Sequence, residues 1–289
     1  MKLYSPAVIT ALMKKHNLRA SKSLGQNFLT DKNIIDKIIK ATQIGEDDTV
    51  IEIGPGTGAL TAAAAESART VIAIEKDTHL IPILKEALSE YENVEIINGD
   101  ILKEDINDLI SRRGSGRDIK IIGNLPYYIT TPVIMKIAEE KTKAKSVTVM
   151  VQKEVADRIE AKPGTKAYGA LTVAVNYYFI VSRVADVPNS VFIPKPNVDS
   201  AILLLTVRES PPINVPDEKL FFACIKAGFG QRRKTLLNSL TGVYGLGRTE
   251  IAKALTAASI DPQGRAETLD IFEFGTLANN IHKEKNENN

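Results

Sequence analysis

The stretch that decides the fold is TVIEIGPGTG, residues 49–58. Its first five residues form a short apolar run around one acid, which predicts a buried β-strand. Three glycines follow at once, and the Ala-rich run 59–68 behind them predicts a helix. In doubly wound α/β folds, a strand, a glycine loop and a helix in this order bring main chain close to a bound nucleoside.

The spacing of the glycines favours one kind of nucleoside cofactor. A dinucleotide-binding loop follows Gly-x-Gly-x-x-Gly, whereas here Gly54, Gly56 and Gly58 alternate and Glu52 lies inside the preceding strand. This tighter pattern favours S-adenosylmethionine, which has no pyrophosphate to place at a helix N-terminus. Gly54 and Gly56 are therefore candidate cofactor contacts, although a plain tight turn would use the same residues.

Polar residues end the next two predicted strands. The apolar run 71–74 ends in Glu75, about 20 residues past the glycines, where an acid can accept hydrogen bonds from both ribose hydroxyls. The run 94–97 is followed by Asp100, which either caps a helix or accepts a hydrogen bond from the cofactor's adenine amino group. Three successive strands that end in suitable polar groups favour the cofactor site over three unrelated turns.

A second motif, NLPYY at 124–128, follows the apolar strand 119–122. Pro126 disfavours the α conformation for Leu125, so the Leu125 carbonyl can point out of the turn beside the side-chain carbonyl of Asn124. Two such acceptors next to the ring of Tyr127 suit a planar substrate with an exocyclic amino group. Alone, the motif is equally consistent with a strand-terminating turn.

The loop at 191–200 lies between two runs, 183–187 and 201–207, that we expect to be a closing antiparallel pair of strands. Its two prolines hold it extended and would fix Phe192 in place. Phe192 is equally consistent with a core residue and with the second half of an aromatic clamp opposite Tyr127.

The remaining patterns are mostly helical. A strand is expected over 146–151. Helices are expected over 7–13, after a cap at Thr30 or Asp31, from Thr131 as N-cap and Pro132 as N1 to about 141, and over 152–161 and 168–178. The composition breaks at RESPP, residues 208–212, so we expect one domain over 1–208 and a small all-α domain over 209–289. We expect helices there from a cap at Asp217 to about 229 and over 232–240, 249–258 and 269–281, with a disordered tail over 283–289.

Composition excludes several classes of protein. Among the 289 residues, 44% are hydrophobic and 25% charged, as in soluble globular proteins, and no apolar run approaches the roughly 18 to 20 residues of a membrane span. The single cysteine, Cys224, excludes an internal disulfide and fits a reducing, cytoplasmic compartment. The three histidines show no metal-ligand or triad spacing, so we expect neither a metal site nor a hydrolase.

The net charge of +2 is unevenly distributed. Residues 1–40 carry eight basic and two acidic side chains, a local net charge of +6, and a second basic cluster lies in QRRKT at 231–235. We expect this second cluster to open a helix, where basic charges oppose the helix dipole and so point to an external partner. Both clusters are candidate phosphate-binding surfaces, and the alternative is an ordinary solvated face.

Taken together, these segments resemble the ribosomal RNA adenine dimethyltransferases of the bacterial KsgA (RsmA) type, from about Lys14 to the C-terminal helices. The resemblance rests on LGQNFL at 24–29, EIGPGTG at 52–58, NLPY at 124–127, FIPKPNVDS at 192–200 and QRRKT at 231–235. It implies a Rossmann-like class I methyltransferase sheet with helices on both faces and a small helical RNA-binding domain. The implied activity is dimethylation of two adjacent adenosines in a hairpin near the 3′ end of 16S (small-subunit) RNA, linked to subunit assembly.

The resemblance also implies roles for individual residues. S-adenosylmethionine would be contacted by Asn27, Leu29, Gly54, Glu75, Asp100 and Asn124. Asn124 and Leu125 would position the target amino group in the turn made by Pro126, with Tyr127 and Phe192 stacking on a flipped adenine. RNA phosphates would be bound by basic residues of both clusters, namely Lys14, Lys15, Arg19, Lys22, Arg232, Arg233, Lys234 and Arg248. Tyr128 stands where some relatives carry Asn, and its role stays open.

Three rival functions remain. A large-subunit RNA methyltransferase conferring antibiotic resistance shares the fold, but such relatives more often carry Asn-Ile-Pro than the Asn-Leu-Pro seen here. A DNA adenine methyltransferase usually has Asp at the place of Asn124. A mainly non-catalytic ribosome-assembly factor is the third, and intact cofactor-contacting residues argue against it. We expect a monomer that acts on the small ribosomal subunit.

Overall fold

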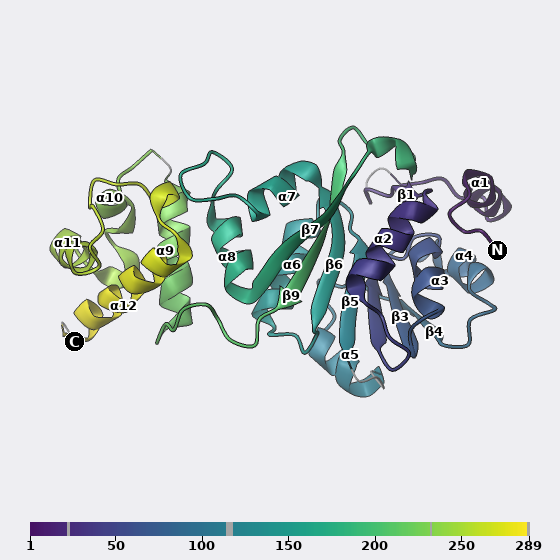
Figure 1. Cartoon of the computed structure of the whole chain (residues 1–289), viewed down its shortest axis with the longest axis horizontal. Helices are drawn as coiled ribbons and strands as arrows, with labels where there is room; N and C mark the ends of the chain where they lie inside the picture. The colour runs from purple at the N-terminus through teal and green to yellow at the C-terminus, as the bar shows by residue number, and fades with distance from the viewer. Residues whose placement is uncertain (22–23, 114–117, 232, 288–289) are drawn as a thin grey trace. The chain divides into compact units, whose positions relative to one another are not determined.

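A computed structural model describes residues 1–21, 24–113, 118–231 and 233–287 of the chain (Figure 1). The chain folds as two compact units, Met1–Ala156 with Ile180–Val207, and Asp157–Phe179 with Arg208–Asn289. It enters the second unit for the last time at Arg208, one residue before the start expected from sequence. Residues 157–179, which the sequence assigns to the first domain, pack with the C-terminal helices. The apolar pattern of a helix shows that the helix is buried, but not which hydrophobic core it joins.

The first unit is built on a seven-stranded sheet of order β4-β3-β2-β5-β6-β9-β7. The first five strands in that order are paired in parallel, and β9 runs antiparallel to β6. The strands are β2 (Thr49–Ile53), β3 (Thr70–Glu75), β4 (Val94–Asn98), β5 (Ile119–Asn124), β6 (Ser146–Gln152), β7 (Phe179–Val187) and β9 (Ser200–Val207). The predicted α/β sheet is confirmed, and its last two strands are neighbours, as expected.

Both faces of this sheet are buried. Val50 and Ile122 belong to one apolar cluster with Ile35 of α2 and Leu60 of α3. Neighbouring strand residues point to the opposite face, and Ile51, like Ile72 and Ile121 on the flanking strands, is fully buried there. The expected helical layers on both sides of the sheet are therefore present. The helices between residues 1 and 160 are α1 (Pro6–Lys15), α2 (Lys32–Thr42), α3 (Ala59–Ala65), α4 (Ile81–Ala87), α5 (Ile106–Arg113), α6 (Thr130–Glu139) and α7 (Lys153–Ile159).

The caps of two helices test the sequence rules. Asp31 caps α2 as expected, accepting hydrogen bonds from the backbone of Asn33 at 2.7 Å and Ile34 at 3.3 Å. The cap predicted for α6 is wrong: Ile129 is the N-cap and Thr130 the first helical residue, so Thr131 and Pro132 lie inside the first turn. The turn after Pro126 leads directly into this helix, and the Thr130 hydroxyl donates to the Pro126 carbonyl at 3.3 Å.

Two very short strands were not predicted. β1 (Phe28–Leu29) pairs antiparallel with β8 (Phe192–Ile193), so that Phe28 lies opposite Ile193 and Leu29 opposite Phe192. The pairing continues at Thr30, whose backbone amide and hydroxyl each donate to the Val191 carbonyl at 2.8 Å. Two motifs far apart in sequence, at 24–29 and 192–200, are thereby joined.

The second unit is helical, as predicted. It contains α8 (Ala170–Tyr178), α9 (Glu218–Gly230), α10 (Leu236–Leu240), α11 (Arg248–Ala257) and α12 (Ile271–Glu287). Phe221, Leu240 and Phe274 are fully buried in its core. Asp217 caps α9 as expected, accepting from the Leu220 amide at 2.9 Å.

Two predictions for this unit are wrong. α10 begins at Leu236 after its N-cap Thr235, so Arg233 and Lys234 precede the helix and the argument from its dipole does not apply to them. α12 continues to Glu287, although we expected the tail from residue 283 to be disordered. Once a helix has formed, polar residues extend it at little cost, and composition alone misses this.

Within the described ranges, no helix combines the length and the apolar character needed to cross a bilayer. Over the same residues, no three His, Cys, Asp or Glu side chains gather in a way that could hold a metal ion.

Candidate active site

One pocket collects ten of the eleven predicted catalytic and cofactor-binding residues. The pocket lies at the C-terminal ends of β2, β3, β4 and β5. The strand order reverses here, because β3 follows β2 on one side and β5 lies next to β2 on the other. Ligands bind at this place in open α/β sheets. The predicted residues that line the pocket are Asn27, Leu29, Gly54, Gly56, Glu75, Asp100, Asn124, Leu125, Pro126 and Tyr127.

The glycine loop has a backbone conformation that favours glycine and little room for a side chain at Gly56. Gly54 and Gly56 have φ of +71° and +61°, in the left-handed region that favours glycine. A Cβ added to Gly56 would lie 3.1 Å from the ring of Phe28, tighter than ordinary packing allows. The loop therefore presents main chain to the pocket, which a cofactor can approach closely.

Glu75 is a buried acceptor with a fixed orientation. Its two carboxylate oxygens accept hydrogen bonds from the amides of Asp77, at 2.8 Å, and Gly56, at 3.3 Å. Burial raises the pKa of Glu75, while the hydrogen bonds from these two amides oppose that shift. The carboxyl group is thus held at the end of β3, where ribose hydroxyls would be bound.

Asp100 combines the two roles that the sequence left open. It accepts a hydrogen bond from the Leu102 amide at 3.1 Å, as a turn cap does, and it also lines the pocket. Burial alone would raise the pKa of Asp100, but its hydrogen bond to Lys76, at 2.9 Å, lowers the pKa overall. The carboxylate therefore stays ionised and can accept a hydrogen bond from an amino group.

Asn124 is oriented by the segment that precedes α2. Its side-chain nitrogen donates to the Asn27 carbonyl at 2.9 Å. Because a carbonyl oxygen can only accept, the amide nitrogen must face Asn27, and this fixes the direction of the side-chain oxygen of Asn124. We expect that oxygen to act as an acceptor beside Leu125.

Tyr127 forms the next part of the same wall. Its hydroxyl is hydrogen bonded to the Ser200 hydroxyl at 3.0 Å, which restrains the half-buried ring. Burial raises the pKa of Tyr127, so the phenol is neutral near pH 7. The structure therefore brings Asn124, Leu125, Pro126 and Tyr127 together in the wall of one pocket.

Phe192 is the one predicted residue of the catalytic group that does not line the pocket. Its side chain is only 3% exposed and lies in the apolar cluster that also contains Leu29, its partner across the β1–β8 pair. In this conformation Phe192 packs as a core residue, whereas Leu29, a member of the same cluster, also lines the pocket.

Six other polar or ionisable lining residues carried no predicted role, namely Gln26, Glu52, Thr57, Lys76, Asp77 and Tyr128. Glu52 is 1% exposed, and its Oε2 atom has no hydrogen-bond partner among the described residues. Burial and the charge of Glu75 raise the pKa of Glu52 to about 8, although the Thr61 side chain opposes this shift. The sequence shows an acid within strand 49–53, but it does not show that one oxygen of this acid lacks a hydrogen-bond partner among the described residues.

The acceptor groups of the pocket fit S-adenosylmethionine. An ammonium group, ribose hydroxyls and an adenine amino group all need acceptors, and the pocket offers the carboxyl groups of Glu52, Glu75 and Asp100. The partnerless buried oxygen of Glu52 is the kind of atom that a bound ligand satisfies.

The predicted RNA-binding residues lie on the surface where they are described. In the first unit Lys14, Lys15 and Arg19 are exposed, and Lys15 forms an ion pair with Glu86 at 2.7 Å. In the second unit Arg233, Lys234 and Arg248 are exposed, and Arg248 donates to the Asn238 side chain at 2.5 Å. Lys22 and Arg232 lie outside the described residues.

Comparison with known proteins gives consistent results. The family model described as "Ribosomal RNA adenine dimethylase" matches residues 17–280. "Ribosomal RNA small subunit methyltransferase A" of Alkaliphilus oremlandii is 50% identical over 98% of this chain and 99% of its own. The protein of that name from Clostridioides difficile is 52% identical over 94% of each chain.

Two solved structures share the fold at lower identity. A dimethyladenosine transferase from Plasmodium falciparum has a TM-score of 0.77 and 28% identity, covering 89% of this chain and 98% of its own. The 23S rRNA methyltransferase ErmE has a TM-score of 0.67 and 27% identity, covering 89% of this chain and 100% of its own.

Proposed function

The chain belongs to the ribosomal RNA adenine dimethylase family, and on this premise we propose that it uses S-adenosylmethionine to dimethylate N6 of two adjacent adenosines in 16S (small-subunit) RNA. The target would be a hairpin near the 3′ end of that RNA. Relatives named for the small subunit are about half identical along nearly the whole chain, whereas the 23S enzyme is 27% identical. The likeness to the large-subunit enzyme supports a shared fold, and the higher identity favours the small subunit.

The observation that carries the proposal is the orientation of Asn124 by Asn27 beside Leu125 and Tyr127. An adenine amino group is a poor nucleophile because its lone pair is delocalised into the ring. The side-chain oxygen of Asn124 and the Leu125 carbonyl would accept its two hydrogens and favour a pyramidal nitrogen. Acceptors placed in advance stabilise the positive charge that develops on nitrogen during the attack.

When bound, S-adenosylmethionine supplies a methyl group on positively charged sulfur: the N6 lone pair forms the new N–C bond as the S–C bond breaks, and an N6 proton passes to water. The chain's own residues have only to hold N6 in line with that methyl group, so catalysis is mainly positioning. No metal is required.

Stacking would hold the flipped adenine. Unstacking a base costs a few kcal/mol, and stacking on an aromatic side chain offsets about 1 to 3 kcal/mol of this. Tyr127, restrained through Ser200, provides one face of the clamp. We keep Phe192 as the opposite face only for a conformation in which its loop has shifted, because its ring is buried here.

The basic residues would bind the RNA backbone. We assign phosphate contacts to Lys14, Lys15 and Arg19 in the first unit and to Arg233, Lys234 and Arg248 in the second, with Lys22 and Arg232 kept from the sequence. Such contacts make binding depend steeply on salt. We further propose that the protein works as a cytoplasmic monomer on the small ribosomal subunit during its assembly.

The test uses small subunits from a strain that lacks this methylation, with isotope-labelled S-adenosylmethionine. The RNA is digested and N6,N6-dimethyladenosine is sought by mass spectrometry, with large subunits and duplex DNA as parallel substrates. The proposal expects the labelled dimethyl product in small-subunit RNA alone. Label in the large subunit would support the resistance enzyme, and bound cofactor with no label anywhere would support an assembly factor.

A further inference from the structure

One wall of the pocket is a short segment that reaches over from the N-terminal region. Residues 24–29, here called the cover segment, all line the pocket. At its C-terminal end the segment is tied to β8 through the β1 pairing, and in its middle the Asn27 carbonyl accepts from Asn124. A third tie is made by Gln26, and neither the sequence nor the proposed chemistry assigns it a role.

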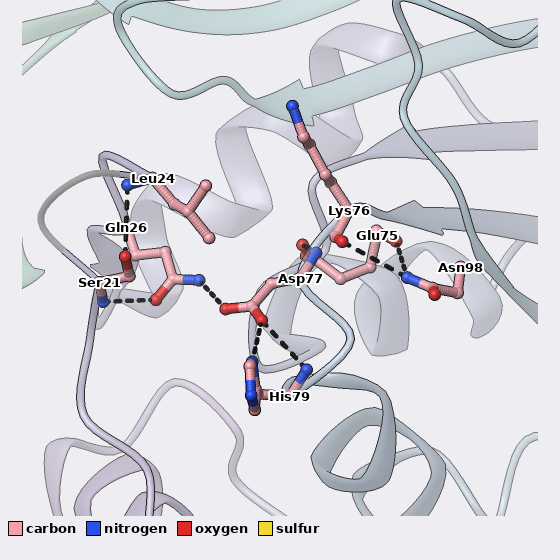
Figure 2. Close-up of polar contacts among 8 residues, drawn as sticks. All are labelled: Ser21, Leu24, Gln26, Glu75, Lys76, Asp77, His79 and Asn98. Carbon is pink, nitrogen blue, oxygen red and sulfur yellow. Dashed lines mark hydrogen bonds and ion pairs between the residues drawn. The ribbon is translucent and has the colours of Figure 1, made fainter.

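Both ends of the Gln26 side-chain amide are engaged, as Figure 2 shows. Its nitrogen donates to Oδ2 of Asp77 at 2.7 Å, and its oxygen accepts from the Ser21 backbone amide at 2.7 Å. The amide cannot rotate by half a turn without breaking both hydrogen bonds. Gln26 therefore has one defined orientation, directed at Asp77.

Further hydrogen bonds fix the orientation of the Asp77 carboxylate. Its second oxygen, Oδ1, accepts from the backbone amide of His79 at 3.0 Å and from the His79 ring at 2.9 Å (Figure 2). Only 12% of the Asp77 side chain is exposed, so water competes weakly for the carboxylate. A hydrogen bond to a charged and largely buried group is stronger than an ordinary one.

The same residue is joined to the predicted ribose acceptor. The Asp77 backbone amide donates to Oε1 of Glu75 at 2.8 Å, and the Asn98 side chain donates to the Glu75 carbonyl at 2.9 Å (Figure 2). The Gln26–Asp77 hydrogen bond thus links the cover segment to the turn that orients Glu75. Loss of the link would release the cover segment at Gln26 and remove one restraint on the turn that orients Glu75.

We propose that Gln26 and Asp77 form a latch, a hydrogen bond that holds the cover segment over bound S-adenosylmethionine and keeps Glu75 in place. Both are positioning residues, and neither takes part in methyl transfer. The proposal rests on the proposed function only for the identity of the cofactor. Because a cofactor under the closed segment leaves only after the segment opens, the latch acts mainly on the dissociation rate.

The test measures binding of S-adenosylhomocysteine, the methyl-transfer product, without any RNA. Calorimetry and stopped-flow dissociation are compared for the wild type, Gln26→Ala, Asp77→Asn and the double variant. Each single change is expected to raise Kd about three- to tenfold, mostly through faster dissociation, as for loss of one charge-assisted hydrogen bond. The Kd of the double variant should be no higher than that of the single variant that binds more weakly, because all three variants lack the charge-assisted hydrogen bond between Gln26 and Asp77.

Two further variants separate the latch from general effects. Asp36→Asn breaks an exposed ion pair with Lys32 on α2, in the same unit, and should leave Kd unchanged. His79→Ala removes the ring contact to Asp77 but keeps the Gln26 bond, so it should change Kd much less than Asp77→Asn. Hydrogen exchange of the amides of residues 24–29 with ligand bound should be faster in Gln26→Ala and Asp77→Asn, while thermal unfolding without ligand stays near that of the wild type.

Additive losses in the double variant would overturn the latch, since each residue would then act separately, for example by touching the cofactor directly. Unchanged Kd and unchanged hydrogen exchange in both single variants would overturn it too, as would a loss in His79→Ala equal to that in Asp77→Asn. Because no RNA is present, a failure of RNA methylation with normal latch behaviour would count against the proposed function alone.

Discussion

Replacing Glu52 with glutamine removes a titratable group from the strand before the glycine loop and hardly changes its size. Glu52 is 1% exposed, and its Oε2 atom has no partner within the described part of the chain. Burial favours the neutral carboxyl, which is why the pKa of Glu52 rises from 4.5 to about 8. The Glu52→Gln variant should therefore differ from the wild type in how its stability depends on pH.

The sign and size follow from this pKa. Between pH 4.5 and about 8 the folded protein keeps the Glu52 proton while the unfolded chain releases it, so raising the pH favours unfolding of the wild type. The full shift corresponds to roughly 5 kcal/mol, an upper bound for a group this buried. As the pH rises from 4.5 to about 8, the free energy of unfolding of the wild type should fall relative to that of Glu52→Gln by at least about 2 kcal/mol. Above about pH 8 the difference between the two proteins should stay constant.

The assay is urea unfolding without cofactor at half-unit steps from pH 4.5 to 8.5, for both proteins. Apart from Glu75, whose charge acts on Glu52, the other groups titrate alike in the two proteins, so the difference in free energy of unfolding reports mainly on Glu52. A difference that stays constant from pH 5 to 8 would refute the reasoning, because it would mean that Glu52 is already ionised in the folded protein.

Three further predictions follow from other contacts. Gly56→Ala places a Cβ 3.1 Å from the Phe28 ring at a φ of +61°, so S-adenosylhomocysteine should bind at least about tenfold more weakly and stability should fall by about 1 to 3 kcal/mol, measured by calorimetry and thermal unfolding. Changing Arg233 and Lys234 together to alanine should reduce the slope of log K for RNA against log salt by about 1 to 2, with cofactor binding unchanged; an unaltered slope would remove both from the RNA surface. Phe192→Ala should destabilise the first unit by about 3 to 5 kcal/mol. Phe192→Leu should keep the fold and the cofactor Kd but lower RNA methylation about tenfold, and normal methylation would leave Phe192 a core residue only.

The sheet edge was predictable because each of its strands is an apolar run followed directly by a polar or glycine signal. Glu75, Asp100 and Asn124 could be assigned to one site because the carboxyl ends of parallel strands meet at one edge. That inference needs only strand order along the chain, and it accounts for eight of the ten predicted residues that line the pocket, because Asn27 and Leu29 were implied only by the family resemblance.

The contacts between distant segments could not be predicted in the same way. The β1–β8 pair is two residues long on each side, so it has no periodicity, and nothing local in LGQNFL names its partner at Phe192. The Gln26–Asp77 bond also joins separate motifs. For Phe192 the sequence could not choose between core and clamp, because burial depends on the packing of Leu29 and its neighbours.

The most direct test of the role of Asn124 is the single-turnover rate of RNA methylation by Asn124→Ala, measured at saturating S-adenosylmethionine. We expect a fall of about 10²- to 10³-fold, the size of effect seen when one preorganised hydrogen-bonding group is removed from a reacting centre. Circular dichroism and S-adenosylhomocysteine binding on the same preparation report the fold and the cofactor site. A near-normal rate with the fold intact would contradict the role of Asn124 in orienting the adenine amino group.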